Sequence, residues 1–298
     1  MAEPSDAART VAPGALRLET VRYEMPRPQV ARITMARPRE RNAQNLQLTY
    51  DLNAAFDHAA QDDAVKVIVL AGDDPHFSAG HDLTGDGGKS WRDYPVVGTW
   101  CGFDCAGAEG RMAREQEIYL GMTERWRNIP KPTIAAVQGK CIAGGLMLAW
   151  ACDLILASED AEFRDPVLEM GVCGVEFFAH PWEIGVRKAK EWLFTSDWLT
   201  AREAEALGMV NRVVPRAGLA DAALDLAERI ARKPSFALKL TKEAVNQTQD
   251  AMGRRTAMLQ AFSLHQLCHS HNMQMYGIPV DPAGLPETVR EKFKKRGG

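Results

Sequence analysis

The segment Phe77-Ser78-Ala79-Gly80-His81-Asp82-Leu83 follows the apolar run Val65–Leu70, and a second turn, Ala143-Gly144-Gly145, follows the apolar run Pro132–Val137. Both have the sequence of a tight turn between a buried strand and a helix. Glycine and other small residues permit such turns, which leave backbone N–H groups pointing outward and let a ligand approach closely. Two such donors facing one oxygen atom form an oxyanion hole. The two turns therefore decide both the expected fold and the expected chemistry.

The composition is that of an ordinary globular protein. The chain has 298 residues, of which 46% are hydrophobic and 25% charged, and this is enough apolar material for a large core. Thirty-six basic and 39 acidic side chains leave a formal net charge of −3. Such a balance gives no broad basic surface for nucleic acid or for an anionic membrane. We therefore expect neither a nucleic acid nor a membrane as a partner.

The sequence also lacks the pattern of a targeting segment. The longest apolar stretch, residues 146–157, is interrupted by Asp153 and is shorter than the roughly 20 residues that span a bilayer. Residues 1–14 lack the basic start and apolar run of a secretory signal. We expect a cytoplasmic protein with a disordered tail over residues 1–20. Its six cysteines are scattered through a chain too large to depend on disulfides, so we expect them to be reduced.

Hydrophobic periodicity predicts an α/β fold. Val30–Met35 alternates as a half-buried strand does, Leu46–Ala60 carries one apolar helical stripe, and Val65–Ala71 has the pattern of a buried strand. This order predicts layered α/β structure with crossover connections. Further helices are predicted over residues 112–127, 144–151, 221–232, 235–248 and 254–275, and further strands over residues 132–138, 153–157 and 210–214.

We divide the chain into a core over residues 21–215 and a helical C-terminal region over residues 216–298. A loop over residues 84–110, rich in glycine and aromatic side chains, interrupts the core. Loops of this length are uncommon inside a compact domain and are usually functional or mobile. The loop is a candidate lid over a substrate. The alternative is a surface insertion whose aromatic side chains pack locally.

Several motifs occur in an order and spacing that resemble the crotonase superfamily, also called the enoyl-CoA hydratase/isomerase family. They are Arg37-Pro38 with Arg41-Asn42-Ala43, the two glycine turns, Cys152-Asp153-Leu154-Ile155, and the segment from Leu199 to Val214. The resemblance implies a spiral of ββα units with a C-terminal helical trimerisation region, assembled as a homotrimer or a dimer of trimers. It also implies an acyl-CoA substrate whose thioester oxygen binds the backbone N–H groups of His81 and Gly144. Coenzyme A enters as part of that substrate, and no other cofactor is expected.

The sequence departs from the family pattern where hydratases carry two catalytic glutamates. The resemblance places those positions at Met147 and Val167. Neither side chain can accept a proton or hold a water molecule for attack, since general acid–base catalysis needs a titratable group in reach. Hydration by the two-glutamate mechanism is therefore not expected.

Other side chains can supply the missing acid or base. Glu176 is our first candidate, because the resemblance places it where other members of the superfamily carry an alternative acid or base. A buried carboxyl among apolar neighbours also has a raised pKa, which suits proton transfer. Asp165 is a weaker candidate, and Glu169 and His180 lie nearby in the sequence. The alternative for Glu176 is a surface carboxylate. We expect the His81 side chain to line the pocket.

The same resemblance suggests the residues that bind the substrate and its coenzyme A portion. They are Arg41, Ala43, Ala79, Gly80, Asp82, Leu83, Gly145, Met147 and Val167. Arg37, Arg39 and Arg41 are candidates for phosphate contacts because guanidinium groups suit phosphate oxygens, although a solvated basic loop is an equal alternative.

A metal site is a further possibility that the sequence raises. The candidate ligands are His265, His269 and His271 with Cys268. Helical spacing places His265 and His269 on one face, but no acidic third ligand is evident from the sequence. We predict no metal.

The leading hypothesis is thus an enoyl-CoA hydratase/isomerase-family enzyme, a lyase or isomerase, that acts on an acyl-CoA through an enolate stabilised by an oxyanion hole. Two alternatives stay open. One is an acyl-CoA decarboxylase or thioester hydrolase of the same superfamily, because a decarboxylase needs no base to generate its enolate. The other is a non-catalytic acyl-CoA-binding protein, for which the apolar Met147 and Val167 are the motivation.

Overall fold

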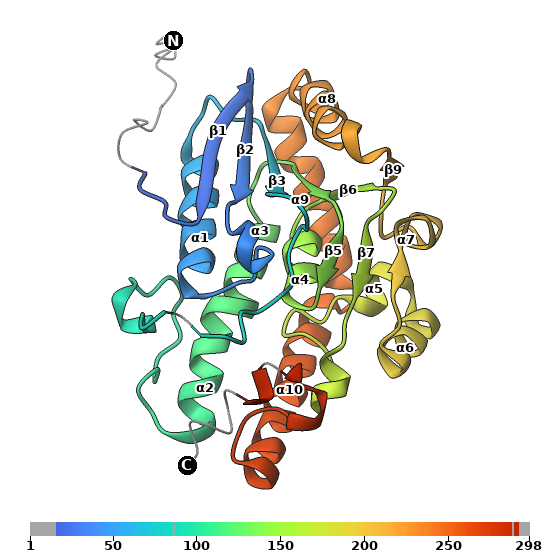
Figure 1. Cartoon of the computed structure of the whole chain (residues 1–298). Coiled ribbons are helices and arrows are strands. Elements are labelled where there is room, and N and C mark those ends of the chain that lie inside the picture. Colours follow the sequence, from blue (N-terminus) through green and yellow to red (C-terminus); the bar gives the residue numbers. More distant parts are fainter. Residues whose placement is uncertain (1–15, 86, 288, 292–298) are drawn as a thin grey trace.

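The computed structural model describes residues 16–85, 87–287 and 289–291, and it shows two β-sheets with helices packed around them (Figure 1). Residues 1–15 of the predicted tail lie outside the described residues. The rest of that segment is anchored, because the backbone N–H groups of Glu19 and Thr20 both donate to Asp51 Oδ2, at 2.8 and 2.7 Å. All six cysteines are free thiols, as predicted.

The main sheet has six strands in the order β1-β2-β3-β4-β6-β9. Their bounds are Val21–Arg27 (β1), Val30–Met35 (β2), Val67–Gly72 (β3), Thr133–Val137 (β4), Leu154–Ser158 (β6) and Arg212–Val214 (β9). The edge strand β1 is antiparallel to β2, and the remaining neighbours are parallel. Parallel strands need crossover connections, and those that follow β2 and β4 supply α1 (Leu46–Gln61) and α4 (Gly144–Trp150).

A smaller sheet lies beside the main one in Figure 1, with the order β5-β7-β8. Its strands are Lys140–Ile142 (β5), Glu162–Arg164 (β7) and Leu199–Thr200 (β8). β5 and β7 pair in parallel, and β7 and β8 are antiparallel. This sheet matters for the site because β5 leads into the second glycine turn.

Helices cover both faces of the main sheet. One face packs against α1, α3 (Met122–Arg127) and α4 in the larger apolar core. The other face packs against α8 (Leu219–Ala231), through residues such as Val69 on the sheet and Ala223 on the helix. Because both faces are buried, the central strands are almost wholly apolar rather than alternating.

This packing changes the expected division of the chain. The predicted helical region over residues 216–298 contains α8, α9 (Ser235–Ala251) and α10 (Arg254–Tyr276), and its first helix, α8, packs on the main sheet. The predicted loop over residues 84–110 is also shorter, since α2 (Gly107–Glu115) begins inside it and a 3₁₀ turn spans Trp91–Asp93. Sequence reasoning missed the helical start because two glycines, which favour loops, occupy the first turn of α2.

The other helices complete the fold. They are a π-helical turn at Gln116–Gly121, α5 (His180–Ile184), α6 (Val186–Thr195), α7 (Ala201–Leu207), α9 (Ser235–Ala251) and α10 (Arg254–Tyr276), with further 3₁₀ turns at Pro38–Glu40, Val167–Met170, Arg216–Gly218 and Pro282–Gly284. A capping box starts α7, with Thr200 and Glu203 bonding each other's backbone N–H groups. Over the described ranges, no helix combines the length and apolarity needed to cross a bilayer.

Candidate active site

The first glycine turn is fixed against residue 44. Gln44 N donates to Gly80 O at 2.7 Å, and Asp82 N donates to Gln44 O at 2.8 Å. Successive N–H groups of an extended chain point in opposite directions, so the N–H of His81, between these two, points away from Gln44. Among the described residues this N–H has no hydrogen-bond acceptor. It is therefore free to bind a ligand.

The second glycine turn is entered from β5 rather than directly from β4. Ala143 N donates to Arg164 O at 2.9 Å, and Leu146 N donates to Ala143 O at 2.8 Å. Ala143 itself has φ of 47° and ψ of −112°, a conformation that a non-glycine residue adopts only under strain. This turn places Gly144 at the first position of α4, where its N–H has no partner within the helix.

The two turns touch each other. Gly80 has a φ of +86°, and a Cβ atom placed on it would lie 2.7 Å from Ile142 O and 3.2 Å from Gly144 N. A Cβ atom on Gly144 would lie 2.5 Å from Cδ2 of the His81 ring and would also collide with the Gln44 amide. Both glycines are therefore required by close approach, and the backbones at positions 81 and 144 are neighbours.

The imidazole of His81 lies between Tyr119 and Glu176. Its ring stacks on Tyr119 with centroids 3.8 Å apart and planes at 11°. Its Nδ1 lies 3.8 Å from Glu176 Oε1. Burial, together with the nearby His265, lowers the pKa of His81 to about 3. The ring is thus neutral at pH 7.

Glu176 is buried beside the two turns rather than exposed at the surface. Its side chain is 4% exposed, and its Oε1 lies 3.6 Å from His265 Nε2. Within the described part of the chain its Oε2 has no hydrogen-bond partner. Burial is the main cause that raises the pKa of Glu176 to about 8. A buried carboxyl with an unused oxygen next to a turn with a free N–H is suited to proton transfer.

Asp165 is committed to the fold. Its Oδ1 accepts from Val167 N at 3.2 Å. Its Oδ2 accepts from Val175 N at 3.2 Å and lies 2.8 Å from His180 Nε2. These contacts hold the segment between β7 and α5 in place. The carboxylate therefore has its bonding capacity used within the protein, and a catalytic role for Asp165 is not what this geometry favours.

We expect Asp165→Ala to lower the free energy of unfolding by about 3 kcal/mol or more, because it leaves buried donors without an acceptor. Urea denaturation of the purified variant measures this change. Glu169→Ala is the matched control, since Glu169 pairs with Arg164 at the surface and its loss should cost less than about 1 kcal/mol. Equal effects of the two variants would contradict the structural role of Asp165.

Met147 and Val167 are part of the apolar core. They are 1% and 8% exposed, respectively, and both pack in the larger core cluster. Apolar side chains at these positions cannot orient a water molecule. The structure offers no carboxylate at either place.

The basic loop before the first turn is only partly free for a ligand. Arg37 Nη2 lies 3.0 Å from Asp82 Oδ2, and Arg37 also donates to Ala43 O. Both Arg37 and Asp82 therefore stabilise the first turn.

The other predicted binding residues near the two turns differ in exposure. Arg39 and Arg41 are exposed, and Leu83 is 39% exposed. Gly145 is buried against Ser78, whose carbonyl oxygen would lie 2.7 Å from a Cβ atom placed on it.

A cleft of about 760 Å³ opens beside these turns. Gln44, Asp82 and Tyr119 line it on the side of the first turn, and Met273 and Pro279 line it on the C-terminal side. The cleft is large enough for a small-molecule ligand and is walled largely by apolar and aromatic groups.

The loop over residues 84–110 forms one wall of this cleft. Trp91, Val96 and Phe103 line it directly. Other aromatic groups anchor the loop, since Tyr94 stacks on Tyr50 with centroids 4.3 Å apart. The two interpretations of the loop thus combine: it packs locally, and it also faces the cleft.

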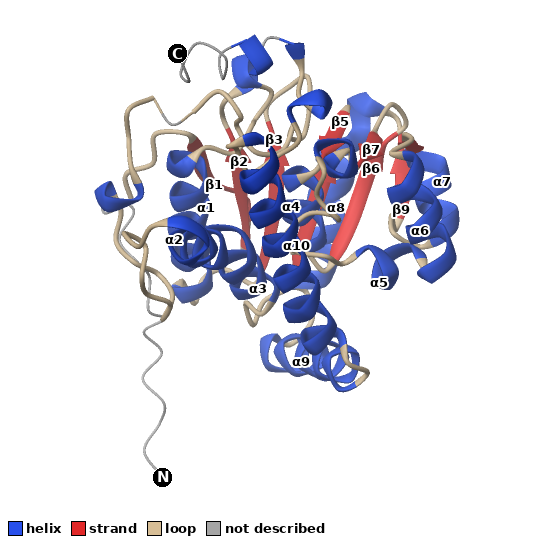
Figure 2. Ribbon diagram, turned by 90° about the horizontal axis from the view of Figure 1, so that it is seen from below, coloured by secondary structure: helices blue, strands red, loops and turns tan. Residues whose placement is uncertain are grey.

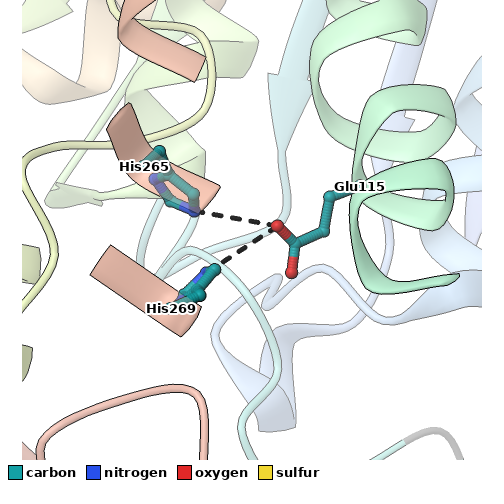
Figure 3. Close-up of side chains that lie close together, drawn as sticks. All are labelled: Glu115, His265 and His269. Atoms are coloured by element: carbon teal, nitrogen blue, oxygen red, sulfur yellow. Dashed lines mark ion pairs between the residues drawn. The ribbon is translucent and has the colours of Figure 1, made fainter. Parts of the chain in front are cut away.

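Sequence reasoning missed one acidic member of this region. Glu115, at the end of α2, lies opposite His265 and His269 on α10 (Figure 3). Its Oε2 is 3.8 Å from His265 Nε2 and 3.7 Å from His269 Nε2. The helical spacing of the two histidines signals a shared face, but no sequence pattern links them to a glutamate some 150 residues away.

The family model for enoyl-CoA hydratase/isomerase matches residues 27–98 and 101–279 of the chain. The chain belongs to this family. Among its relatives, the putative enoyl-CoA hydratase EchA13 of Mycobacterium tuberculosis is 47% identical over 260 residues, which cover 85% of this chain and 81% of that protein.

Solved structures support the same assignment. A probable enoyl-CoA hydratase from Mycobacterium smegmatis is 48% identical with a TM-score of 0.78, and one from Mycobacterium thermoresistibile is 48% identical with a TM-score of 0.80. Each comparison covers 87% of this chain and 98% of the solved chain. The predicted crotonase-like α/β fold with helices at its C-terminus is thereby confirmed.

Proposed function

We propose that this family member converts an acyl-CoA thioester through an enolate, with the thioester oxygen bound between the backbone N–H groups of His81 and Gly144. Removing a proton next to the thioester carbonyl places negative charge on that oxygen. Fixed donors in a site that excludes water stabilise the charge without having to reorganise, and each is typically worth about 3 to 4 kcal/mol.

The observation that carries this proposal is the contact between the two glycine turns. Gly80 approaches Gly144 so closely that a Cβ atom on Gly80 would lie 3.2 Å from Gly144 N. The neighbouring N–H of His81 points away from its strand partner and has no acceptor among the described residues. Two donors on adjacent backbones are what one thioester oxygen requires.

Glu176 is the acid or base in this proposal. It lies beside His81, with Oε1 at 3.8 Å from Nδ1 of the ring, and unlike Asp82, which pairs with Arg37, it is buried without a cationic partner at hydrogen-bond distance among the described residues. Because Met147 and Val167 are apolar, no pair of carboxylates at those positions holds a water molecule. One carboxyl that moves a proton between two carbons suffices for isomerisation, which this arrangement therefore favours over two-glutamate hydration.

The cleft supports a bulky, largely apolar acyl group. Trp91, Phe103 and Ile118 contribute to its walls, and a volume of about 760 Å³ exceeds what a short acyl chain fills. The same cleft is lined by three basic and three acidic side chains, and the basic ones are candidates for contacts with the phosphate groups of coenzyme A: Lys89, Arg111 and Arg114, beside Asp82, Glu115 and Glu117.

A panel of acyl-CoA esters tests the function. Purified protein is incubated with 2-enoyl-, 3-enoyl- and malonyl-type CoA esters carrying short or bulky acyl groups, and the products are separated by liquid chromatography. We expect double-bond migration in a bulky enoyl-CoA to be the fastest reaction. Binding of these esters by calorimetry without conversion of any of them would refute an enzymatic role.

We also propose that the chain assembles as a homotrimer. Helix α9 projects from the body of the molecule in Figure 2, and none of its described side chains is buried. Large apolar side chains on α9 and α10 are exposed, including Phe236 at 70%, Val245 at 65% and Leu267 at 64%. Such a surface is typical of an interface. Light scattering on a sizing column should give three times the chain mass, and a monomer would contradict the proposal.

A further inference from the structure

A second cluster of ligand-type side chains lies on α2 and α10, outside the two glycine turns. Glu115 is in the last turn of α2, and His265 and His269 are one helical turn apart on α10, so both rings face the same carboxylate (Figure 3). One ligand atom from each of the three residues lies within 4.8 Å of the other two. Both histidines are buried, at 4% and 7% exposure.

The orientation of both rings is fixed by the backbone. His265 Nδ1 lies 2.7 Å from Gly174 O, and His269 Nδ1 lies 2.5 Å from Pro279 O. A carbonyl oxygen only accepts, so in each ring Nδ1 carries the hydrogen and Nε2 presents a lone pair. Both lone pairs are directed toward Glu115 Oε2.

These lone pairs have no adequate partner in the protein. The separations of 3.8 and 3.7 Å from Glu115 Oε2 are too long for hydrogen bonds. His265 Nε2 is buried without any hydrogen-bond partner among the described residues. Buried polar atoms are normally paired, so an unpaired nitrogen aimed at a carboxylate indicates a missing ligand.

We propose that Glu115, His265 and His269 bind a divalent transition-metal ion, with zinc as the best match. Two imidazole nitrogens and one carboxylate oxygen form a ligand set that zinc uses when other coordination positions stay open. Histidine ligands of metals usually donate their second ring N–H to a backbone carbonyl or carboxylate, and both rings here do so.

Binding an ion requires the three ligands to draw together. Ligands about 2.0 to 2.1 Å from zinc in tetrahedral geometry lie about 3.4 Å from one another. The Glu115 carboxylate has to move toward the rings by roughly half an ångström. The two ring Nε2 atoms lie up to 4.8 Å apart, so the rings of His265 and His269 also have to tilt toward each other by up to about 1.4 Å. The Gln266 amide already donates to Glu115 Oε2, the oxygen that faces the two rings, and helps to orient it.

The surroundings define how the ion is reached. Glu115 lines the cleft, so an ion can enter from the solvent. Arg111 also lines the cleft next to this site and opposes a cation. Glu176 Oε1 lies 3.6 Å from His265 Nε2, so its carboxyl is a neighbour of the proposed ion. The open coordination positions would thus adjoin the cleft in which an acyl group is proposed to bind.

Metal binding is tested on the purified full-length protein without any acyl-CoA. Protein is treated with a chelator, dialysed, and titrated with Zn²⁺ in a calorimeter, and bound metal is counted by plasma mass spectrometry. We expect one ion per chain. The variants His269→Gln and Glu115→Gln should weaken binding by about 100-fold or more, since each removes a ligand.

Matched controls lie on the same two helices. His271→Gln on α10 and Glu109→Gln on α2 replace exposed residues of the same types, and both should bind Zn²⁺ as the original chain does. Circular dichroism verifies that each variant is folded. Cobalt substitution gives a second readout, because tetrahedral Co²⁺ with nitrogen and oxygen ligands has visible absorption that His269→Gln should abolish.

Absence of stoichiometric Zn²⁺ binding by the folded original chain would overturn the proposal. Binding that survives both ligand variants, or that His271→Gln removes equally, would overturn it as well. None of these results bears on the oxyanion hole, because the assay contains no thioester, so failure here and failure of the proposed function are distinguishable.

Discussion

Replacing Gly144 with proline is expected to lower kcat by about 10²- to 10³-fold relative to Gly144→Ala, measured on whichever acyl-CoA the original chain converts fastest. Proline lacks the backbone N–H, and it is tolerated at the first position of a helix, which Gly144 occupies in α4. The loss is therefore one of the two donors to the thioester oxygen, with the helix retained.

The alanine variant is the control for bulk. Both substitutions add a Cβ atom that would lie 2.5 Å from the His81 ring, so both displace that ring and the Gln44 amide. Only proline also removes the donor. If the two variants have the same kcat while both are folded by circular dichroism, the N–H of Gly144 does not contribute to catalysis.

Glu176→Gln is expected to lower kcat by about 10²- to 10⁴-fold and to leave KM nearly unchanged. Glutamine keeps the shape of the side chain and its place beside His81, 3.8 Å away, but it cannot take up or release the proton. A lower kcat with an unchanged KM identifies a chemical role, because replacing a merely structural residue would change both constants or neither.

Glu183→Gln is the matched control for this variant. Glu183 is also a carboxyl for which burial raises the pKa, to about 7, but it lines a different cavity together with Trp150 and Arg254. Its substitution should leave kcat within about twofold, since the cavity it lines is not lined by any residue of the two glycine turns. A Glu176→Gln variant as active as Glu183→Gln would show that another group moves the proton.

The parts of the fold that the sequence predicted are those with a strong local pattern. β2, β4 and α4 each combine an apolar pattern with a nearby glycine or proline, and α1 has a regular apolar stripe that begins after Asn45. The structure has all four within a few residues of the predicted bounds. The family motifs around the glycine turns are equally local. They were therefore sufficient to indicate the superfamily before any coordinates.

The parts that could not be predicted depend on contacts between distant segments. β5 and β7 have three residues each, too few for a periodic pattern, and they are strands only because they pair with each other. The role of α8 in covering the sheet depends on tertiary packing, and its amphipathic pattern alone does not say which surface it covers.

The candidate active site was hard to predict for the same reason, because its contacts join segments that are distant in the sequence. The carboxyl of Asp165 could have served as a catalytic acid as far as the sequence shows. Its structural role depends on contacts with Val175 and His180, which lie 10 and 15 positions later in the chain. Glu115 was not singled out at all, because only the packing of α2 on α10 brings it to His265 and His269. The burial of Glu176, in contrast, could be expected from its apolar sequence neighbours.

The most direct test of the central claim is a crystal structure of the protein with a non-reactive acyl-CoA thioester bound. The account predicts that the thioester oxygen lies about 2.7 to 3.1 Å from both the backbone nitrogen of His81 and that of Gly144. A thioester oxygen that is bound elsewhere, or that reaches neither nitrogen, would contradict it.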